Sequence, residues 1–90
     1  MIHFADDFFY ITNSLRKMDI VYCLSMINFG RKSEISSIML IPEQSTYSIL
    51  KNLEKRDIVG IKKISGTNIY FLTKKGRIIA DQLKEYHGIK

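Results

Sequence analysis

The sequence predicts a mainly α-helical domain with one small β-hairpin, an α+β fold. Apolar residues recur at helical spacing in five segments of the 90-residue chain. Between the last two segments, two β-rich runs flank Ser65-Gly66-Thr67-Asn68, which is typical of a hairpin. Hydrophobic residues make up 46% of the chain, which favours a folded structure over a disordered one. The length suits one domain, residues 1–90, and is too short for two.

Three helices are expected before the proline at position 42. The first covers about residues 4–12 and the second about residues 15–29, with Gly30 as a stop signal. Arg31 and Lys32 are expected to form a short extended link, and Ser33 is a favourable N-cap for the third helix. Pro42 ends that helix, because proline disfavours helical geometry at the residue before it. The expected buried residues of the third helix are Ile35, Ile38 and Met39.

The fourth helix, about residues 43–56, has one apolar and one polar face. Thr46, Leu50 and Leu53 recur at helical spacing and form the expected inner face. The outer face carries no acidic residue before Glu54, near the helix end. Its polar and basic residues are Gln44, Ser45, Tyr47, Ser48, Lys51, Asn52 and Lys55.

The hairpin follows the fourth helix, with strands expected at residues 58–64 and 69–72. Lys62 and Lys63 make it basic, and Thr73 is the expected cap of a fifth helix at about residues 74–86. The apolar stripe of the fifth helix consists of Ile78, Ile79, Leu83 and Tyr86. Two helices joined by a tight turn and followed by a basic hairpin are typical of a winged helix-turn-helix.

Two stretches of the chain resemble known regulators. SEISSIMLIPEQSTYSILKNLEKRDIV (33–59) resembles the helix-turn-helix of MarR-like winged-helix regulators, and IYFLTKKGRIIADQL (69–83) resembles the end of their wing and the helix after it. The resemblance covers about residues 15–86 and implies a winged-helix core over 15–73. Residues 1–14 and 74–90 then form additional N-terminal and C-terminal helices for dimerisation, as in compact archaeal and archaeal-virus versions. Leu40 and Pro42 depart from the usual Gly and Ser-like cap, so we expect a turn of different shape.

The resemblance and the charge together imply a transcriptional regulator that binds double-stranded DNA. The formal net charge of +5 favours a polyanionic partner. The fourth helix is expected to enter the major groove, where base edges differ in their donor and acceptor patterns. The hairpin is expected to contact phosphates or the adjacent minor groove. The expected DNA-binding residues are Gln44, Ser45, Tyr47, Ser48, Lys51, Asn52, Lys55, Lys62, Lys63, Thr67 and Asn68.

A homodimer is expected, with the first and last helices as its interface. One recognition helix of about 14 residues is only ~21 Å long and reads few base pairs. A two-fold dimer places two such helices ~34 Å apart, one turn of DNA. Apolar residues of both terminal helices are expected to need a partner surface, namely Phe4, Phe8, Phe9, Ile11, Ile78, Ile79, Leu83 and Tyr86. The alternative is that both helices fold back on their own domain.

The sequence gives less support to other functions. The main alternative is a winged helix that acts as a protein-interaction module in a larger assembly. The sequence shows no nucleophile–base pair, phosphate-binding glycine loop or metal cluster, so neither an enzyme nor a cofactor is expected. A small-molecule effector stays an open question. No apolar run approaches the ~20 residues of a membrane span, and a cytoplasmic location is expected. Cys23 is expected to be a buried structural thiol, with a redox role as the alternative.

Overall fold

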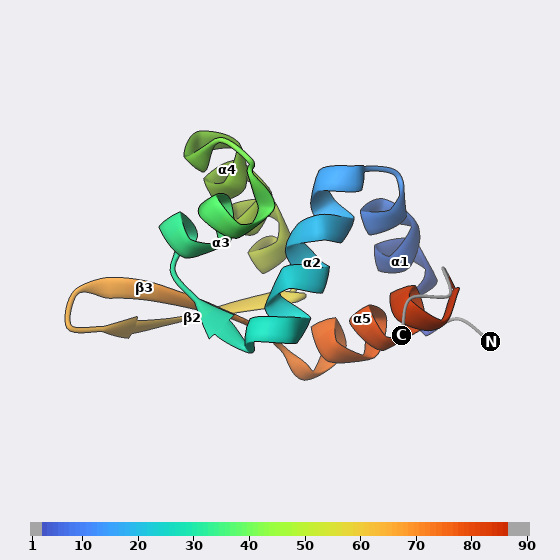
Figure 1. The fold of residues 1–90 in the computed structure, drawn as a ribbon. Helices are drawn as coiled ribbons and strands as arrows, with labels where there is room; N and C mark the ends of the chain where they lie inside the picture. The colour runs from blue at the N-terminus through green and yellow to red at the C-terminus, as the bar shows by residue number, and fades with distance from the viewer. Residues whose placement is uncertain (1–2, 87–90) are drawn as a thin grey trace.

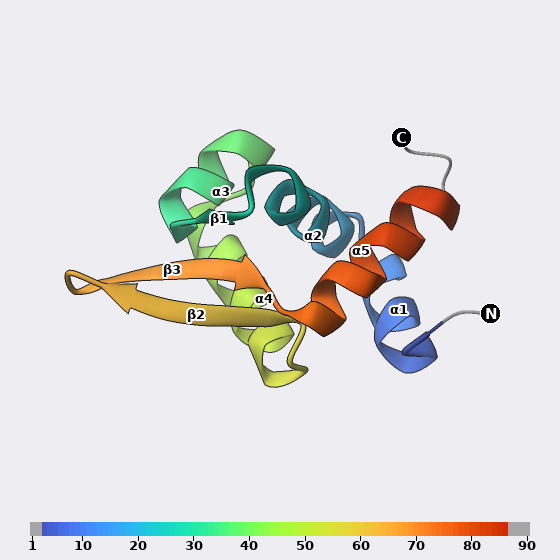
Figure 2. The same ribbon diagram turned by 90° about the horizontal axis from the view of Figure 1, so that it is seen from below.

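The computed structural model describes residues 3–86, which form five helices and a three-stranded antiparallel sheet (Figure 1). The elements are α1 (Ala5–Thr12), α2 (Leu15–Ile27), β1 (Phe29–Gly30), α3 (Lys32–Met39), α4 (Glu43–Lys55), β2 (Val59–Ile64), β3 (Thr67–Leu72) and α5 (Lys74–Tyr86). The predicted α+β class with a hairpin is confirmed, and the element order is that of a winged helix. The hairpin projects from one end of the body, while α1 and α5 lie together at the other end (Figures 1 and 2).

A short strand, β1, differs from the prediction that α2 continues to residue 29. The helix ends at Ile27 because Asn28 takes a positive φ of 72°. Phe29 and Gly30 then pair with Phe71 and Tyr70, which gives the sheet the order β1-β3-β2. Strand β1 therefore connects the C-terminal end of α2 to strand β3 of the wing.

The start of α3 also differs from the prediction. The helix begins at Lys32, so the expected extended link is right for Arg31 only, and the expected N-cap at Ser33 is wrong. Arg31 is the extended N-cap residue, and its N–H donates to Glu34 Oε1 at 2.8 Å. The carboxylate of Glu34 supplies the cap that Ser33 was expected to provide. Ile38, expected to be buried, is 48% exposed, because α3 packs through Ile35.

The wing is longer than predicted because its turn is shorter. Ser65 and Gly66 both have positive φ, 49° and 79°, as a two-residue type I′ turn requires. Thr67 and Asn68, expected in the loop, therefore belong to β3. Ile64 pairs with Thr67, and each strand of the hairpin has six residues.

The core includes both terminal helices. Phe8 and Ile11 of α1 and Ile79 and Leu83 of α5 are at most 5% exposed. The expectation that these four residues need a partner surface is therefore wrong, because α1 and α5 pack on α2 and on each other. On α2, Leu15 and Met26 are exposed, and the core is formed by Ile20, Val21, Cys23 and Leu24. On the terminal helices the large apolar side chains that stay exposed are Phe4, Phe9 and Tyr86.

The turn between α3 and α4 contains a strained leucine. Leu40 has a φ of 56° and is 90% exposed, so its side chain gains almost nothing from packing. We expect Leu40→Gly to stabilise the protein by about 1 kcal/mol, because glycine adopts this conformation without steric cost. Urea unfolding of both proteins measures the difference. Ser37→Gly, an exposed position inside α3, is the control and should instead destabilise by about 1 kcal/mol. A Leu40→Gly protein that is less stable than wild type contradicts this account.

A partly buried carboxylate joins α1 to the rest of the molecule. Asp7 Oδ1 lies 3.0 Å from Arg56 Nη1, and Asp7 Oδ2 lies 2.7 Å from Lys75 Nζ. Burial raises the pKa of Asp7, but the hydrogen bonds and charges of Lys75 and Arg56 outweigh burial and hold the pKa below its usual 3.8. The folded pKa thus lies below the unfolded one. The stabilisation is complete above the unfolded pKa and is lost as the pH falls through the folded pKa.

Acid should therefore remove the contribution of Asp7 to stability. We expect Asp7→Asn to be less stable than wild type near pH 7, with a difference that shrinks as the pH falls below about 4. Urea unfolding of both proteins across this range measures it. A difference that is constant or grows toward low pH contradicts the assignment of the ion pairs.

Candidate nucleic-acid interface

Helix α4 is fixed by its inner face, as predicted. Thr46, Leu50 and Leu53 are completely buried, and Thr46 Oγ1 donates to Pro42 O at 3.1 Å. The buried hydroxyl of Thr46 therefore has a hydrogen-bond partner. The opposite face consequently points to solvent. Its exposed members are Gln44, Tyr47, Ser48, Lys51, Asn52 and Lys55, and Ser45 is half-buried.

The wing supplies a second set of exposed polar residues. Lys62, Lys63, Thr67 and Asn68 are all exposed. Lys63 pairs with Asn68 across the hairpin, so a cation and an amide lie side by side on neighbouring strands. At the base of the wing, burial raises the pKa of Tyr70, an effect that a hydrogen bond with Asn68 partly offsets. The phenol is therefore neutral near pH 7.

A groove lies between α4 and the wing. Tyr47 of α4 and both Thr67 and Asn68 of the wing line it, so the structure brings together two predicted sets that are distant in sequence. The N-terminal turn of α3 forms its third wall. The lining residues are Arg31, Lys32, Ser33, Glu43, Tyr47, Gly66, Thr67, Asn68 and Tyr70.

Lys32 acquires a role that the sequence did not suggest. Arg31 and Lys32, expected only as a short link between helices, both line this groove. Lys32 Nζ lies 3.5 Å from Glu43 Oε1 and 5.1 Å from the centre of the Tyr47 ring. The ammonium group therefore offsets the acidic residue in the first turn of α4 and holds the aromatic ring beside the groove.

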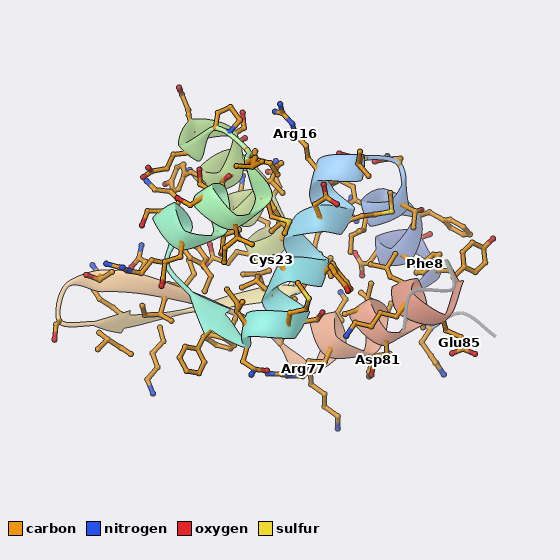
Figure 3. The ribbon with its side chains drawn as sticks, viewed as in Figure 1. Phe8, Arg16, Cys23, Arg77, Asp81 and Glu85 are labelled. Atoms are coloured by element: carbon orange, nitrogen blue, oxygen red, sulfur yellow. The ribbon has the colours of Figure 1, made fainter. Side chains whose placement is uncertain are left out.

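Arg16 extends this surface from another helix. It lines a second depression together with Pro42, Gln44, Ser45, Ser48 and Ile49. Figure 3 shows its side chain projecting beyond the first turn of α2, on the side of the molecule that bears α4. Sequence reasoning missed Arg16, because nothing in the local pattern of α2 places it beside α4.

The cations of this surface are largely unpaired. Among residues 3–86, ion pairs engage only Arg31, Lys32, Arg56 and Lys75. Lys51, Lys55, Lys62, Lys63 and Arg16 consequently have no carboxylate partner in the described part of the chain. Such cations are suited to a polyanion, because binding it requires no internal ion pair to break.

Other kinds of site are not visible in the described residues. Within residues 3–86, no three His, Cys, Asp or Glu side chains gather as a metal site. No helix of that range is long and apolar enough to cross a bilayer. Cys23 is completely buried, as predicted, and burial raises the pKa of its thiol. A thiol in this environment is unreactive in the folded protein.

Comparison with known proteins supports the fold. No family model and no curated protein matches the sequence. The structure is similar to NMB1585 of Neisseria meningitidis, a MarR family regulator (TM-score 0.75, 17% identity, 83% of this chain and 55% of that one). It is also similar to the antimony-specific transcriptional repressor AntR (TM-score 0.75, 13% identity, 98% of this chain and 86% of that one). A third match is AF1382 of Archaeoglobus fulgidus (TM-score 0.74, 26% identity, 80% and 84%).

These similarities define the class of fold. The chain has the winged-helix fold of MarR-family transcriptional regulators. It spans about half the length of several of them, NMB1585 included. The matched regulators therefore contain further segments with no counterpart in these 90 residues.

Proposed function

We propose that this protein is a cytoplasmic transcriptional regulator that binds double-stranded DNA in a sequence-specific manner. The observation that carries the proposal is the joint surface of α4 and the wing, whose exposed lysines lack carboxylate partners within residues 3–86. An α-helix fits the major groove of B-DNA, and a hairpin beside it reaches the backbone or minor groove. The similar fold of NMB1585, a MarR family regulator, and of AntR, a transcriptional repressor, supports the same function.

The proposed contacts divide by chemistry. Tyr47 and Ser48, with Gln44, Ser45 and Asn52, face the bases, because their side chains donate and accept hydrogen bonds. Lys51 and Lys55 bind phosphates from α4, and Lys62, Lys63, Thr67 and Asn68 do so from the wing. Arg16 adds a phosphate contact beside the N-terminal half of α4. Phosphate contacts set affinity and register, whereas base contacts set sequence preference.

We also propose that the regulator is a homodimer whose interface keeps only the exposed part of the predicted one. Phe4, Phe9 and Tyr86 remain exposed at the end formed by α1 and α5. A largely apolar groove of about 510 Å³ also runs between α2 and α5. Its lining residues are Leu15, Met18, Asp19, Tyr22, Ala80, Leu83 and Lys84. A second copy of the chain would cover this surface and complete the domain organisation expected for residues 1–14 and 74–90.

The function is tested by selection from random DNA. Duplexes retained by the protein should converge on one sequence, and a dimer should select an inverted repeat with half-sites about one helical turn apart. Light scattering at micromolar concentration should give twice the 10.5 kDa mass of one chain. Retained duplexes with no common sequence would contradict specific binding. A single asymmetric half-site together with a monomeric mass would contradict the proposed dimer but not the proposed sequence-specific binding.

A further inference from the structure

A cluster of side chains holds the C-terminal end of α4 against α1 and α5. Asp7 of α1 accepts hydrogen bonds from Arg56 Nη1 and Lys75 Nζ, at 3.0 and 2.7 Å. The guanidinium carbon of Arg56 lies 3.7 Å from the centre of the Tyr10 ring, so Arg56 is stacked as well as paired. Tyr10 also belongs to α1, and its ring is covered by Lys17 Nζ at 3.6 Å. Four elements of the chain, α1, α2, α4 and α5, thus meet at this cluster.

Arg56 is the residue at which α4 ends. It is the C-cap, and Asp57 after it has a positive φ of 61°. The amides of Asp57 and Ile58 donate back to Glu54 O and Leu53 O at 2.9 and 3.0 Å, which is the Schellman pattern. Lys75 Nζ additionally donates to Arg56 O at 2.8 Å. Both the side chain and the backbone of this residue are therefore held by α1 and α5.

The two ends of α4 are anchored differently. At the N-terminal end, α4 follows the exposed Leu40 turn, and its N-cap Pro42 makes no side-chain hydrogen bond. At the C-terminal end, one carboxylate that is only 15% exposed holds two cations from two elements. Without the charge of Asp7, Arg56 and Lys75 would face each other as like charges. Asp7 thus fixes the C-terminal end of α4 to α1 and α5, whereas at the other end the Lys32–Glu43 ion pair, at 3.5 Å, joins α4 to α3.

We propose that Asp7 is a positioning residue that sets the orientation of α4 and couples α1 to the DNA-binding surface. The proposal rests on the DNA-binding function proposed above. Helix α1, which carries Asp7, lies at the opposite end of the molecule from the wing (Figure 1), and the ion pairs of Asp7 involve no proposed DNA contact. It acts through Arg56, the neighbour of the proposed phosphate ligand Lys55. By linkage, a partner or ligand that displaces α1 changes the DNA affinity, and DNA changes the stability of α1 by the same amount.

The first test needs no DNA. Asp7→Asn removes the charge and keeps the size of the side chain. Asp6→Asn is the matched control, since Asp6 is the exposed neighbour in the same first turn of α1 and has no ion pair. Amide hydrogen exchange at Asp57 and Ile58 should be about tenfold faster in Asp7→Asn than in Asp6→Asn. Equal exchange at these amides in the two variants overturns the positioning role whether or not the protein binds DNA.

The second test measures specificity. Both variants gain one unit of charge, so nonspecific attraction to DNA changes equally in each. At a temperature where circular dichroism shows both fully folded, Asp7→Asn should lose about tenfold in affinity for the selected sequence relative to a scrambled duplex. Asp6→Asn should keep the wild-type ratio. A merely stabilising residue would leave this ratio unchanged in both variants, and that result overturns the proposal. Failure of wild type itself to bind any duplex overturns the proposed function instead.

A third measurement covers the case in which Asp7→Asn does not fold. Wild-type protein is exchanged alone, with the selected duplex and with the scrambled duplex. Only the selected duplex should slow exchange of the amides of Phe8 and Asn13, which donate within and just after α1 to Phe4 O and Phe9 O. Unchanged protection of α1 on specific binding overturns the coupling.

Discussion

Replacing Gly76 by alanine is expected to destabilise the fold by about 3 kcal/mol, because α5 passes too close to the start of β2 for any side chain. A Cβ on Gly76 would collide with Ile58 O, and a backbone carbonyl cannot move aside by changing a rotamer. That carbonyl also accepts hydrogen bonds from Thr73 N and Thr73 Oγ1, both at 3.1 Å. Thr73 Oγ1 in turn caps α5 by accepting from Gly76 N at 3.0 Å. Moving Ile58 would therefore disturb the cap as well.

Gly66→Ala is the control for this substitution. A Cβ there meets no atom within 4 Å, and the only cost arises from its φ of 79°. That cost is about 1 kcal/mol. Urea unfolding of the two variants should therefore separate them clearly, with Gly76→Ala the less stable. Equal unfolding midpoints would show that α5 and β2 are not in close contact. The same geometry explains why glycine closes the segment LTKKG, on which the resemblance to MarR-like regulators partly rests.

Substitutions on α4 and on the wing should have different effects on DNA binding. Tyr47→Ala is expected to weaken binding to the selected sequence by ~1–3 kcal/mol, because a base contact is lost, with little change for a scrambled duplex. Lys63→Ala is expected to weaken both by a similar factor, because a phosphate contact carries no sequence information. Fluorescence anisotropy with both duplexes measures the four affinities.

Arg77→Ala is the matched control for the wing lysine. Arg77 is an exposed cation of α5, and its side chain points away from α4 (Figure 3). Its removal changes the net charge as Lys63→Ala does, yet should leave both affinities within about twofold of wild type. If Arg77→Ala weakens binding as much as Lys63→Ala, overall charge rather than the wing explains the affinity. If Lys63→Ala alters the preferred sequence and Tyr47→Ala does not, the two roles are reversed.

The parts of the fold that follow from periodicity were predictable. Thr46, Leu50 and Leu53 repeat at the helical period, so the buried face of α4 and its polar outer face follow from sequence alone. Thr73 as a helix cap and Cys23 as a buried thiol depend on local chemistry and were also predictable. In each case the residues that decide the structure are neighbours along the chain.

The parts that depend on long-range contacts were not predictable. A strand of two residues has no periodicity, and β1 exists only because Phe29 and Gly30 pair with β3. The burial of Phe8 depends on contacts with α5, including the Tyr86 ring, whose centre lies 5.4 Å from that of Phe8. In the sequence, where these contacts cannot be seen, the apolar residues of α1 were therefore interpreted as a dimer surface. The Asp7 cluster and the approach of Arg16 to α4 likewise join residues that only the tertiary fold brings together.

The most direct test of the central claim is the salt dependence of DNA binding by the unmodified protein. Affinity for genomic duplex fragments is measured from about 50 mM to 200 mM salt, the range in which phosphate contacts have their effect. The expected result is clear binding at low salt and a steep linear fall of log affinity against log salt, with a slope of about −0.9 for each phosphate neutralised. Several contacts from α4 and the wing should give a slope of several units. No binding to any fragment at the lowest salt would contradict the account.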